Sequence, residues 1–310
     1  MDLKRFGKPG IILNRMGFGG WQLGNTAFWG EMEEADGIRL VRAAIDKGIN
    51  FFDTAPGYAN GLSETIIGKA IGSDRHALLI STKFGHKADG TSDWRVEAIE
   101  PAIHESLGRL KTTYLDSVIL HNPAIDILRG ETGHFDELAR LKRSGLIRAY
   151  GVSIDTKTEL ETVLDHLYVD VVEILFNVFF QSPRDLYERV KAAGIFLIAK
   201  VPLDSGWLSG KYDDQSIFTG IRSRWSREDI QRRARLVRSI KDICGGEDIS
   251  LPALAFLLSY DTVACLIPGI KTIRQMNDNL AALHYPLPAV QKRALEELYD
   301  REIRHNPLPW

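Results

Sequence analysis

Cysteine is scarce in this chain, because only Cys244 and Cys265 occur among its 310 residues. A secreted disulfide framework needs several paired cysteines, so that class of protein is excluded. So few cysteines favour a reducing compartment. The first ten residues also lack the apolar segment of a signal peptide. We therefore expect a cytoplasmic protein.

Long apolar runs and an excess of charge of one sign are lacking too. The longest apolar stretches, such as residues 251–258, fall far short of the ~20 residues of a membrane-spanning helix. The 39 basic and 41 acidic residues give a formal net charge of −2, whereas binders of nucleic acid or membrane surfaces usually have a basic excess. The eight histidines show no metal-ligand spacing. We expect no nucleic-acid partner, no membrane partner and no metal site.

The chain does have a regular alternation of short apolar runs and longer amphipathic stretches. Residues 36–47 illustrate an amphipathic stretch, with Ile38, Val41 and Ile45 on one helical face and Gly48 just after it. The apolar runs are hydrophobic at nearly every position, as expected for parallel strands that are covered on both faces. There are eight such runs: residues 16–20, 50–54, 77–82, 117–121, 149–153, 171–176, 196–200 and 264–268.

Eight strand–helix units of similar length predict an α/β fold, the parallel (β/α)8 or TIM barrel, and their even spacing disfavours a doubly wound sheet. We expect a single domain over residues 1–310, with an N-terminal β-hairpin at residues 3–14 and a C-terminal extra helix in residues 286–310. Residues 84–94 and 203–225 form long connections after predicted strands. Both lie where such barrels build their active sites.

Polar side chains stand at the carboxyl ends of three successive predicted strands. Asp53 ends the second strand and Tyr58 follows shortly, while Lys83 ends the third strand and His121 the fourth. We expect these groups to converge, with Lys83 paired to Asp53 because an isolated buried charge is prohibitive. A nearby cation lowers the pKa of a tyrosine, so Tyr58 is predicted to exchange a proton with oxygen near neutral pH. Taken alone, three of these residues also have ordinary structural explanations. Asp53 could cap a helix, Lys83 could be a solvated cation, and Tyr58 could pack within a loop.

Six segments carry a distinctive pattern: residues 49–58, 61–64, 81–84, 115–123, 147–153 and 201–211. In this order and spacing they closely resemble the aldo-keto reductase superfamily, and the resemblance extends from the N-terminal hairpin to about Ala282. It implies a (β/α)8 barrel that binds a nicotinamide cofactor in extended form. It also implies that the catalytic residues are Asp53, Tyr58, Lys83 and His121.

By this resemblance, the cofactor would extend from the barrel mouth to the start of the eighth helix. Its carboxamide would meet Ser153 and Glu173, its pyrophosphate would follow residues 203–205 toward Lys211, and its adenosine end would lie near residues 268–279. Trp21 is a candidate for this site and, with Phe28, Trp29 and Trp94, for the substrate pocket. The predicted cofactor-binding residues are Trp21, Asp53, Ser153, Glu173, Val201, Leu203, Ser205, Lys211, Gly269, Lys271, Gln275, Asp278 and Asn279.

Three positions depart from the residues that the family usually has. Ile154 stands in place of asparagine, Glu173 in place of glutamine, and Lys200 in place of an aromatic residue that often stacks on the nicotinamide. A carboxylate at residue 173 accepts a hydrogen bond from the carboxamide nitrogen but donates none to the carboxamide oxygen. These departures bear on how the cofactor is seated.

These observations predict an oxidoreductase that transfers a hydride between nicotinamide and a small aldehyde, ketone or sugar, with Tyr58 as general acid or base. NADP(H) is expected over NAD(H), because Lys271, Arg274 and Arg222 supply cations and residues 267–277 contain no acidic residue. One alternative is an NAD-dependent aldose or pyridoxal-type dehydrogenase that works oxidatively. Another is a regulatory subunit that senses the cofactor. The sequence does not identify the substrate, the direction of the reaction or the oligomeric state.

Two further features receive structural interpretations. Tyr187 and Lys191 have the Tyr-x-x-x-Lys spacing of short-chain dehydrogenases, but we interpret them as one exposed helix face. The arginine-rich residues 222–238 are interpreted largely as a solvated helix face. Its predicted inward side chains are Ile230, Leu236, Val237 and Ile240.

Overall fold

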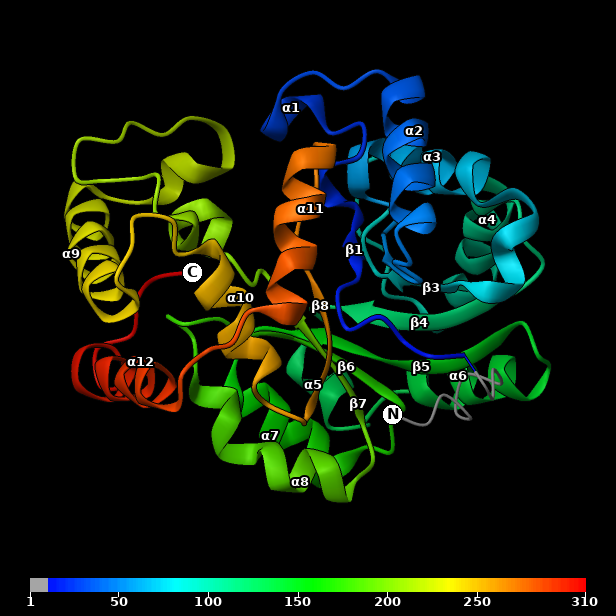
Figure 1. Cartoon of the computed structure of the whole chain (residues 1–310). Coiled ribbons are helices and arrows are strands. Elements are labelled where there is room, and N and C mark those ends of the chain that lie inside the picture. Colours follow the sequence, from blue (N-terminus) through cyan, green and yellow to red (C-terminus); the bar gives the residue numbers. More distant parts are fainter. Residues whose placement is uncertain (1–10) are drawn as a thin grey trace.

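Eight parallel strands in sequence order form the centre of the computed structural model, which describes residues 11–310 (Figure 1). Parallel bridges from Met16 to Leu266 and from Gly19 to Gly269 bring the first strand against the last and close the barrel. The predicted (β/α)8 barrel is therefore confirmed. The strands are β1 (Phe18–Gly19), β2 (Phe51–Asp53), β3 (Leu79–Phe84), β4 (Leu115–His121), β5 (Ile147–Ile154), β6 (Val171–Leu175), β7 (Phe196–Lys200) and β8 (Val263–Ile267).

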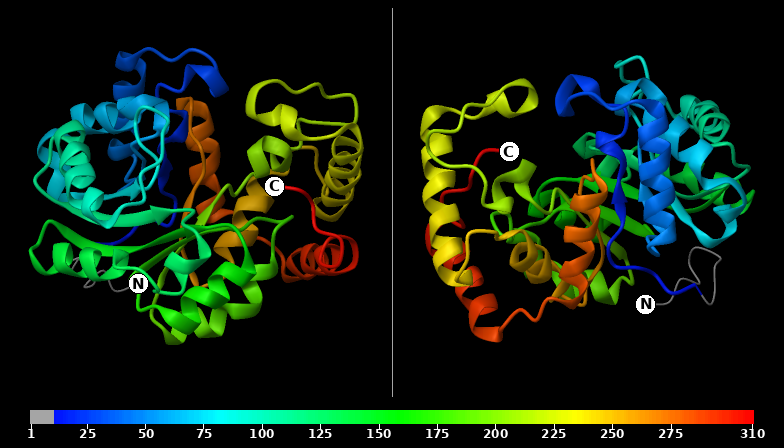
Figure 2. Two further views of the ribbon diagram at one scale, coloured as in Figure 1. Left: turned by 180° about the vertical axis from the view of Figure 1, so that it is seen from behind. Right: turned by 45° about the horizontal axis from the view of Figure 1, so that its top comes forward.

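Helices alternate with these strands and cover the outside of the barrel (Figure 1). The extra helix expected in residues 286–310 is present as α12, which packs beside α9 (Figure 2). The helices are α1 (Thr26–Trp29), α2 (Glu34–Asp46), α3 (Leu62–Ile71), α4 (Ile99–Leu110), α5 (Ile125–Leu128), α6 (His134–Arg143), α7 (Lys157–His166), α8 (Tyr187–Ala192), α9 (Arg227–Cys244), α10 (Ser250–Leu258), α11 (Ile273–Ala281) and α12 (Ala289–Glu302).

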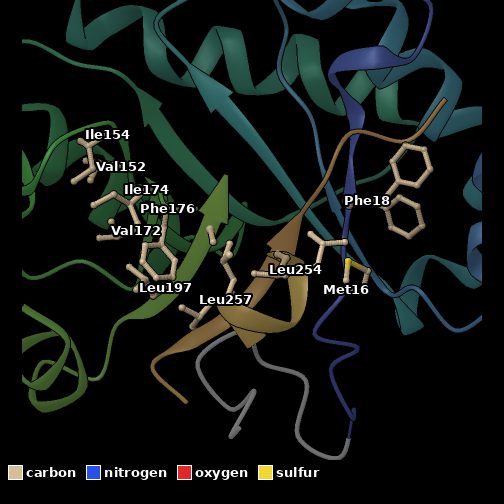
Figure 3. Packing of buried hydrophobic residues seen from close by; sticks show 14 of the residues in the cluster. Met16, Phe18, Val152, Ile154, Val172, Ile174, Phe176, Leu197, Leu254 and Leu257 are labelled. Atoms are coloured by element: carbon tan, nitrogen blue, oxygen red, sulfur yellow. The ribbon is translucent and has the colours of Figure 1, made fainter. Parts of the chain in front are cut away.

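Two apolar layers hold the barrel together, because successive residues of a strand point to opposite faces. The outward side chains pack against the helices, and Figure 3 shows Val152 and Ile154 of β5 beside Val172 and Ile174 of β6. The inward side chains form a second, smaller cluster inside the barrel. Its buried members are Phe51, Leu79, Ile119, Ala149, Val171, Phe196, Ile198, Ala264, Cys265 and Ile267.

The same alternation decides which polar residues point into the barrel. Phe51 lies in the inner cluster, so Asp53, two residues later, points the same way. Lys83, His121, Ser153, Glu173 and Lys200 are likewise an even number of residues beyond inner-cluster members of β3 to β7. All six are at or near the carboxyl ends of their strands. The strand pattern therefore directs a polar layer to one mouth of the barrel.

Most of the predicted hairpin over residues 3–14 falls on residues outside the described part of the chain. Residues 11–14 lie in no strand. The long connection 203–225 contains two short 3-10 segments, Asp204–Ser209 and Gly220–Arg224. Figure 2 shows this connection and α9 on one side of the molecule, α1 and α2 on the other, and α11 between them. Within residues 11–310, no helix combines the length and the apolar character needed to cross a membrane.

Candidate active site

A buried ion pair lies at the mouth of the barrel. The ammonium of Lys83 donates to both carboxylate oxygens of Asp53 at 2.6 Å, and to the carbonyl oxygen of Thr54 at 3.1 Å. Both charged side chains are at most 3% exposed. The pairing of Lys83 with Asp53 that we expected from the sequence is therefore present, and it uses the three N–H groups of the lysine.

Tyr58 and His121 lie directly beside this ion pair. The ammonium of Lys83 is 5.1 Å from the centre of the Tyr58 ring, and the rings of Tyr58 and His121 are 6.0 Å apart in an edge-to-face arrangement. Tyr58 begins a short 3-10 segment after β2, whereas His121 is the last residue of β4. The structure thus brings together the four side chains that the sequence predicted to converge.

Burial governs the protonation of these groups. It raises the pKa of Tyr58 above its ordinary value, and the opposing effect of Lys83 is too small to reverse the shift. The lowered tyrosine pKa expected from the sequence is therefore wrong, because desolvation of the phenolate outweighs attraction to the ammonium. Burial also lowers the pKa of His121 well below its ordinary value, aided by Lys83, Lys200 and His86. The imidazole is neutral at neutral pH.

A second set of polar groups continues across the mouth from the ion pair. One Glu173 oxygen accepts from the Ser153 hydroxyl at 3.0 Å, and the other is 3.4 Å from the ammonium of Lys83. The ammonium of Lys200 donates to the Ser153 oxygen at 2.8 Å and pairs with Asp155 at 2.8 Å. Ser153 and Glu173 are register partners on β5 and β6. A continuous polar chain therefore runs from β2 to β7.

Strained backbone surrounds the same mouth. Seven non-glycine residues of the described chain have positive φ, and six of them follow β2, β4 or β7. Val201 is the most unusual of them, with φ of 52°, because β-branched residues strongly disfavour this region. Such strain costs about 1–3 kcal/mol per residue and concentrates at functional sites. The six residues are Ala59, Asn60, Asn122, Val201, Asp204 and Ser205.

The segment after β7 forms one side of the predicted nucleotide path. The Val201 carbonyl oxygen accepts from the Asn177 side chain at 3.0 Å, and the Leu203 carbonyl oxygen accepts from the Gly206 amide at 2.8 Å. The guanidinium of Arg222 donates to the carbonyl oxygen of Ser205 at 2.9 Å. Farther along, Lys211 is exposed, and its ammonium is 4.8 Å from the centre of the Tyr212 ring.

The start of α11 forms the far end of the path. A side chain at Gly269 would overlap Gln22, because an added Cβ would be 1.9 Å from the Gln22 side-chain nitrogen. The ammonium of Lys271 donates to the carbonyl oxygen of Trp29, and the backbone amide of Lys271 donates to the Gln275 side chain at 2.9 Å. Gln275 and Asp278 are exposed, whereas Asn279 is buried.

Aromatic side chains form the rim of the mouth. The Trp21 ring centre is 6.4 Å from that of Tyr58 and 5.3 Å from that of Trp29. On the opposite loop, Trp94 packs edge-to-face on His86 at 5.9 Å. These rings give the mouth an apolar border around its polar floor.

Four residues near the mouth were not among the predicted site residues. His86 packs edge-to-face on His121 at 5.0 Å, and the Asn122 amide oxygen accepts from Lys200 at 3.2 Å. Asp155 pairs with Lys200, and Gln22 adjoins Gly269. Asn122 and Asp155 come one and two residues after predicted strand ends, so their position in the sequence was the available signal.

Two sequence interpretations need correction. Tyr187 does not lie on an exposed helix face, because it is only 6% exposed and packs against Phe176 and Tyr260. The arginine-rich helix does turn Ile230, Leu236, Val237 and Ile240 inward, as expected. Arg233 on the same helix is fully buried, however, and pairs with the buried Asp204 at 3.1 Å.

Several buried polar atoms along this path lack a hydrogen-bond partner within the described chain. They are Gln22 Oε1, His121 Nδ1, Glu173 Oε2 and Asn279 Nδ2. Buried polar groups are normally satisfied by protein, water or ligand. A nicotinamide nucleotide offers amide, hydroxyl and phosphate groups, so this donor and acceptor set fits such a group.

Comparison with known proteins agrees with this geometry. The Aldo/keto reductase family profile matches residues 15–300. The chain is 30% identical to the chloroplastic pyridoxal reductase of Arabidopsis thaliana, over 92% of this chain and 83% of the relative. It is 26% identical to the NADH-specific methylglyoxal reductase of Escherichia coli K12, over 95% and 97%.

A solved structure shows the same fold. The glycerol dehydrogenase of Gluconobacter oxydans superposes with a TM-score of 0.77, at 23% identity, over 96% of this chain and 94% of the other. Members of the matched family are oxidoreductases that use nicotinamide cofactors on carbonyl substrates. With its barrel and its match over residues 15–300, the chain belongs to the aldo/keto reductase family.

Proposed function

We propose that this protein interconverts a small carbonyl compound and its alcohol with NADP(H), and that Tyr58 transfers the proton. The observation that carries the proposal is the buried Lys83–Asp53 pair beside Tyr58 and His121 at the barrel mouth. A bound nicotinamide would supply or accept the hydride. The substrate class is a small aldehyde, ketone or sugar, because an aromatic rim borders the polar groups of the mouth.

Each residue then has a defined task. Tyr58 gives a proton to the carbonyl oxygen in reduction and takes it back in oxidation. Lys83 supports this transfer, because its ammonium stabilises the phenolate, and Asp53 holds the ammonium in place. His121 is neutral and positions the carbonyl oxygen by donating a hydrogen bond, which an imidazole kept neutral by burial and nearby cations is able to do.

Replacing Tyr58 by phenylalanine tests the proposal. The Y58F variant keeps the ring and loses the exchangeable proton, and removal of a general acid or base typically slows the reaction ~10²–10⁴-fold. We expect kcat to fall by a factor near the upper end of this range, measured by absorbance at 340 nm with a panel of aldehydes and sugars. Binding of the cofactor, measured by fluorescence titration, should be retained. Turnover within a few-fold of wild type would reject the role of Tyr58, and a wild-type protein that binds cofactor without turnover would favour the sensor alternative.

We also propose that NADP(H) is preferred to NAD(H). Lys271 and Arg274 lie at the start of α11, where the helix adds backbone donors and positive potential, and residues 267–277 contain no carboxylate to repel a 2′-phosphate. The relative from Escherichia coli is named as NADH-specific, so the preference needs a direct measurement.

Calorimetric titration of both nucleotides measures that preference. We expect tighter binding of NADPH than of NADH by the wild-type protein. K271A should weaken the binding of NADPH selectively, whereas K69A, which removes an exposed lysine from α3, should leave it unchanged. Equal or tighter binding of NADH by the wild-type protein would reject the preference.

The proposed compartment is the cytoplasm. Cys244 and Cys265 are free thiols, and Cys265 is buried inside the barrel. Free thiols are typical of proteins that stay in a reducing environment.

A further inference from the structure

Glu173 is a fully buried carboxylate whose contacts differ from those of a structural ion pair. It is 2% exposed and lies on β6, opposite Ser153 of β5. One of its oxygens accepts from Ser153, but the other has no hydrogen-bond donor within the described chain. That second oxygen faces the Lys83 ammonium at 3.4 Å.

Lys83 does not need this second carboxylate. An ammonium has three N–H donors, and those of Lys83 are directed to the two oxygens of Asp53 and to the carbonyl oxygen of Thr54. Glu173 therefore adds negative charge to the pair without satisfying a donor. An amide at this position would also accept from Ser153, so the Ser153 contact does not require a charged group.

The polar chain contains more carboxyl groups than ammonium groups. The carboxylates of Asp53, Glu173 and Asp155 face two ammonium groups, those of Lys83 and Lys200. Lys200 is held by Asp155 and by the Ser153 oxygen, and it reaches Glu173 only through that hydroxyl. Together, Lys83 and Lys200 keep the pKa of Glu173 below its ordinary value although burial raises it. The pKa of Asp53, in contrast, is raised well above its ordinary value by burial and by the charge of Glu173, because the two carboxylates compete for the Lys83 ammonium. Glu173 therefore shares its cation with Asp53 and has none of its own.

We infer that Glu173 sets the preference of this protein between the two redox forms of its cofactor and favours the oxidised form. The inference rests on the proposed function, because it assumes that a nicotinamide binds at this mouth. An oxidised nicotinamide ring carries a positive charge that the reduced ring lacks. A buried carboxylate that only shares a cation attracts the charged ring and is indifferent to the neutral one, and it acts strongly in a medium of low effective dielectric constant.

Affinity for the two redox forms, rather than turnover, tests this inference. The dissociation constants of NADP⁺ and NADPH are measured by fluorescence titration and calorimetry, and their ratio is compared between proteins. E173Q keeps the shape and the acceptor for Ser153 but removes the charge. We expect the ratio to move roughly tenfold toward the reduced form, about the size expected for one charge at ~10 Å with an effective dielectric constant near 20. K200Q removes a nearby cation and should move the ratio in the opposite direction.

A matched control separates this electrostatic effect from a general loss of buried charge. Asp116 is also a buried carboxylate in a barrel strand, but it lies near the amino end of β4, at the opposite end of the barrel from the mouth. D116N should leave the ratio of the two dissociation constants within twofold of wild type.

The outcomes distinguish this inference from the proposed function. An unchanged ratio in E173Q, or an equal shift in D116N, would overturn the inference and leave the proposed function standing. A shifted ratio in E173Q together with full turnover by Y58F would support the inference and reject the proposed role of Tyr58. A wild-type protein that binds neither nucleotide would overturn both.

Discussion

At the scale of single residues, the positions of polar residues at strand ends predicted which side chains meet at the barrel mouth. Asp53 and Lys83 lie on neighbouring strands, so their contact followed from the order of the strands. The contact between Lys83 and Glu173 joins β3 to β6 across the mouth, and no local sequence pattern encodes such a distance. The direction of the Tyr58 pKa was also beyond the sequence, because it depends on how completely the ring is buried.

The depressed pKa of His121 predicts how stability depends on pH. The folded protein keeps this imidazole neutral, whereas the unfolded chain takes up a proton below about pH 6.5. The unfolding free energy should therefore fall as the pH falls below that value, by up to about 1.4 kcal/mol per pH unit from this group. H121N removes the titrating group, so urea denaturation between pH 7.5 and 5 should show a shallower decline than in wild type. Equal slopes in the two proteins would contradict the assignment.

At the scale of elements, the sequence predicted the C-terminal ends of helices, which glycines mark, better than their N-terminal starts. Gly48, Gly145 and Gly194 each lie just after the end of a helix, and each has a positive φ, as a glycine that terminates a helix usually does. The helix expected at residues 36–47 instead begins at Glu34, because an exposed first turn carries no apolar period to mark it. The buried Tyr187 shows a related limit, since one of its two partner rings, that of Tyr260, is distant in the sequence.

Replacing either of two glycines on neighbouring helices by alanine should change the unfolding free energy, in opposite directions at the two positions. A Cβ at Gly68 of α3 would be 2.4 Å from the carbonyl oxygen of Arg109 on α4, so the helices must move apart. A Cβ at Gly108 of α4 meets nothing within 4 Å. We expect G68A to lower the unfolding free energy by about 1–3 kcal/mol through overpacking. G108A should raise it by about 0.5–1 kcal/mol through its better helix propensity. Denaturant titration of both variants checks the signs, and two changes of the same sign would contradict this account of the α3–α4 packing.

At the scale of the whole molecule, the repeated strand–helix period was sufficient to predict the barrel. It did not show how the long connection after β7 is attached, because its anchors are far apart in the sequence. Asp204 of this connection pairs with Arg233 of α9, and Arg233 also donates to the carbonyl oxygen of Pro309 at 2.7 Å. Leu308 is buried, and the Trp310 ring packs against Phe180. The C-terminal residues therefore link α9, and through Arg233 the connection, to the segment that follows β6.

Because of this attachment, loss of Arg233 should affect both the stability of the fold and the predicted nucleotide path. R233M retains apolar bulk but leaves Asp204 buried without its cation, and breaking a buried pair from one side costs about 3–5 kcal/mol. R235M, which removes an exposed arginine from the same helix, should change the unfolding free energy by no more than about 0.5 kcal/mol. Because Ser205 adjoins Asp204 on the predicted nucleotide path, R233M should also weaken cofactor binding. Denaturant and cofactor titrations of both variants measure the two effects. If R233M matched R235M in both, the pair would not be what holds the connection against the barrel.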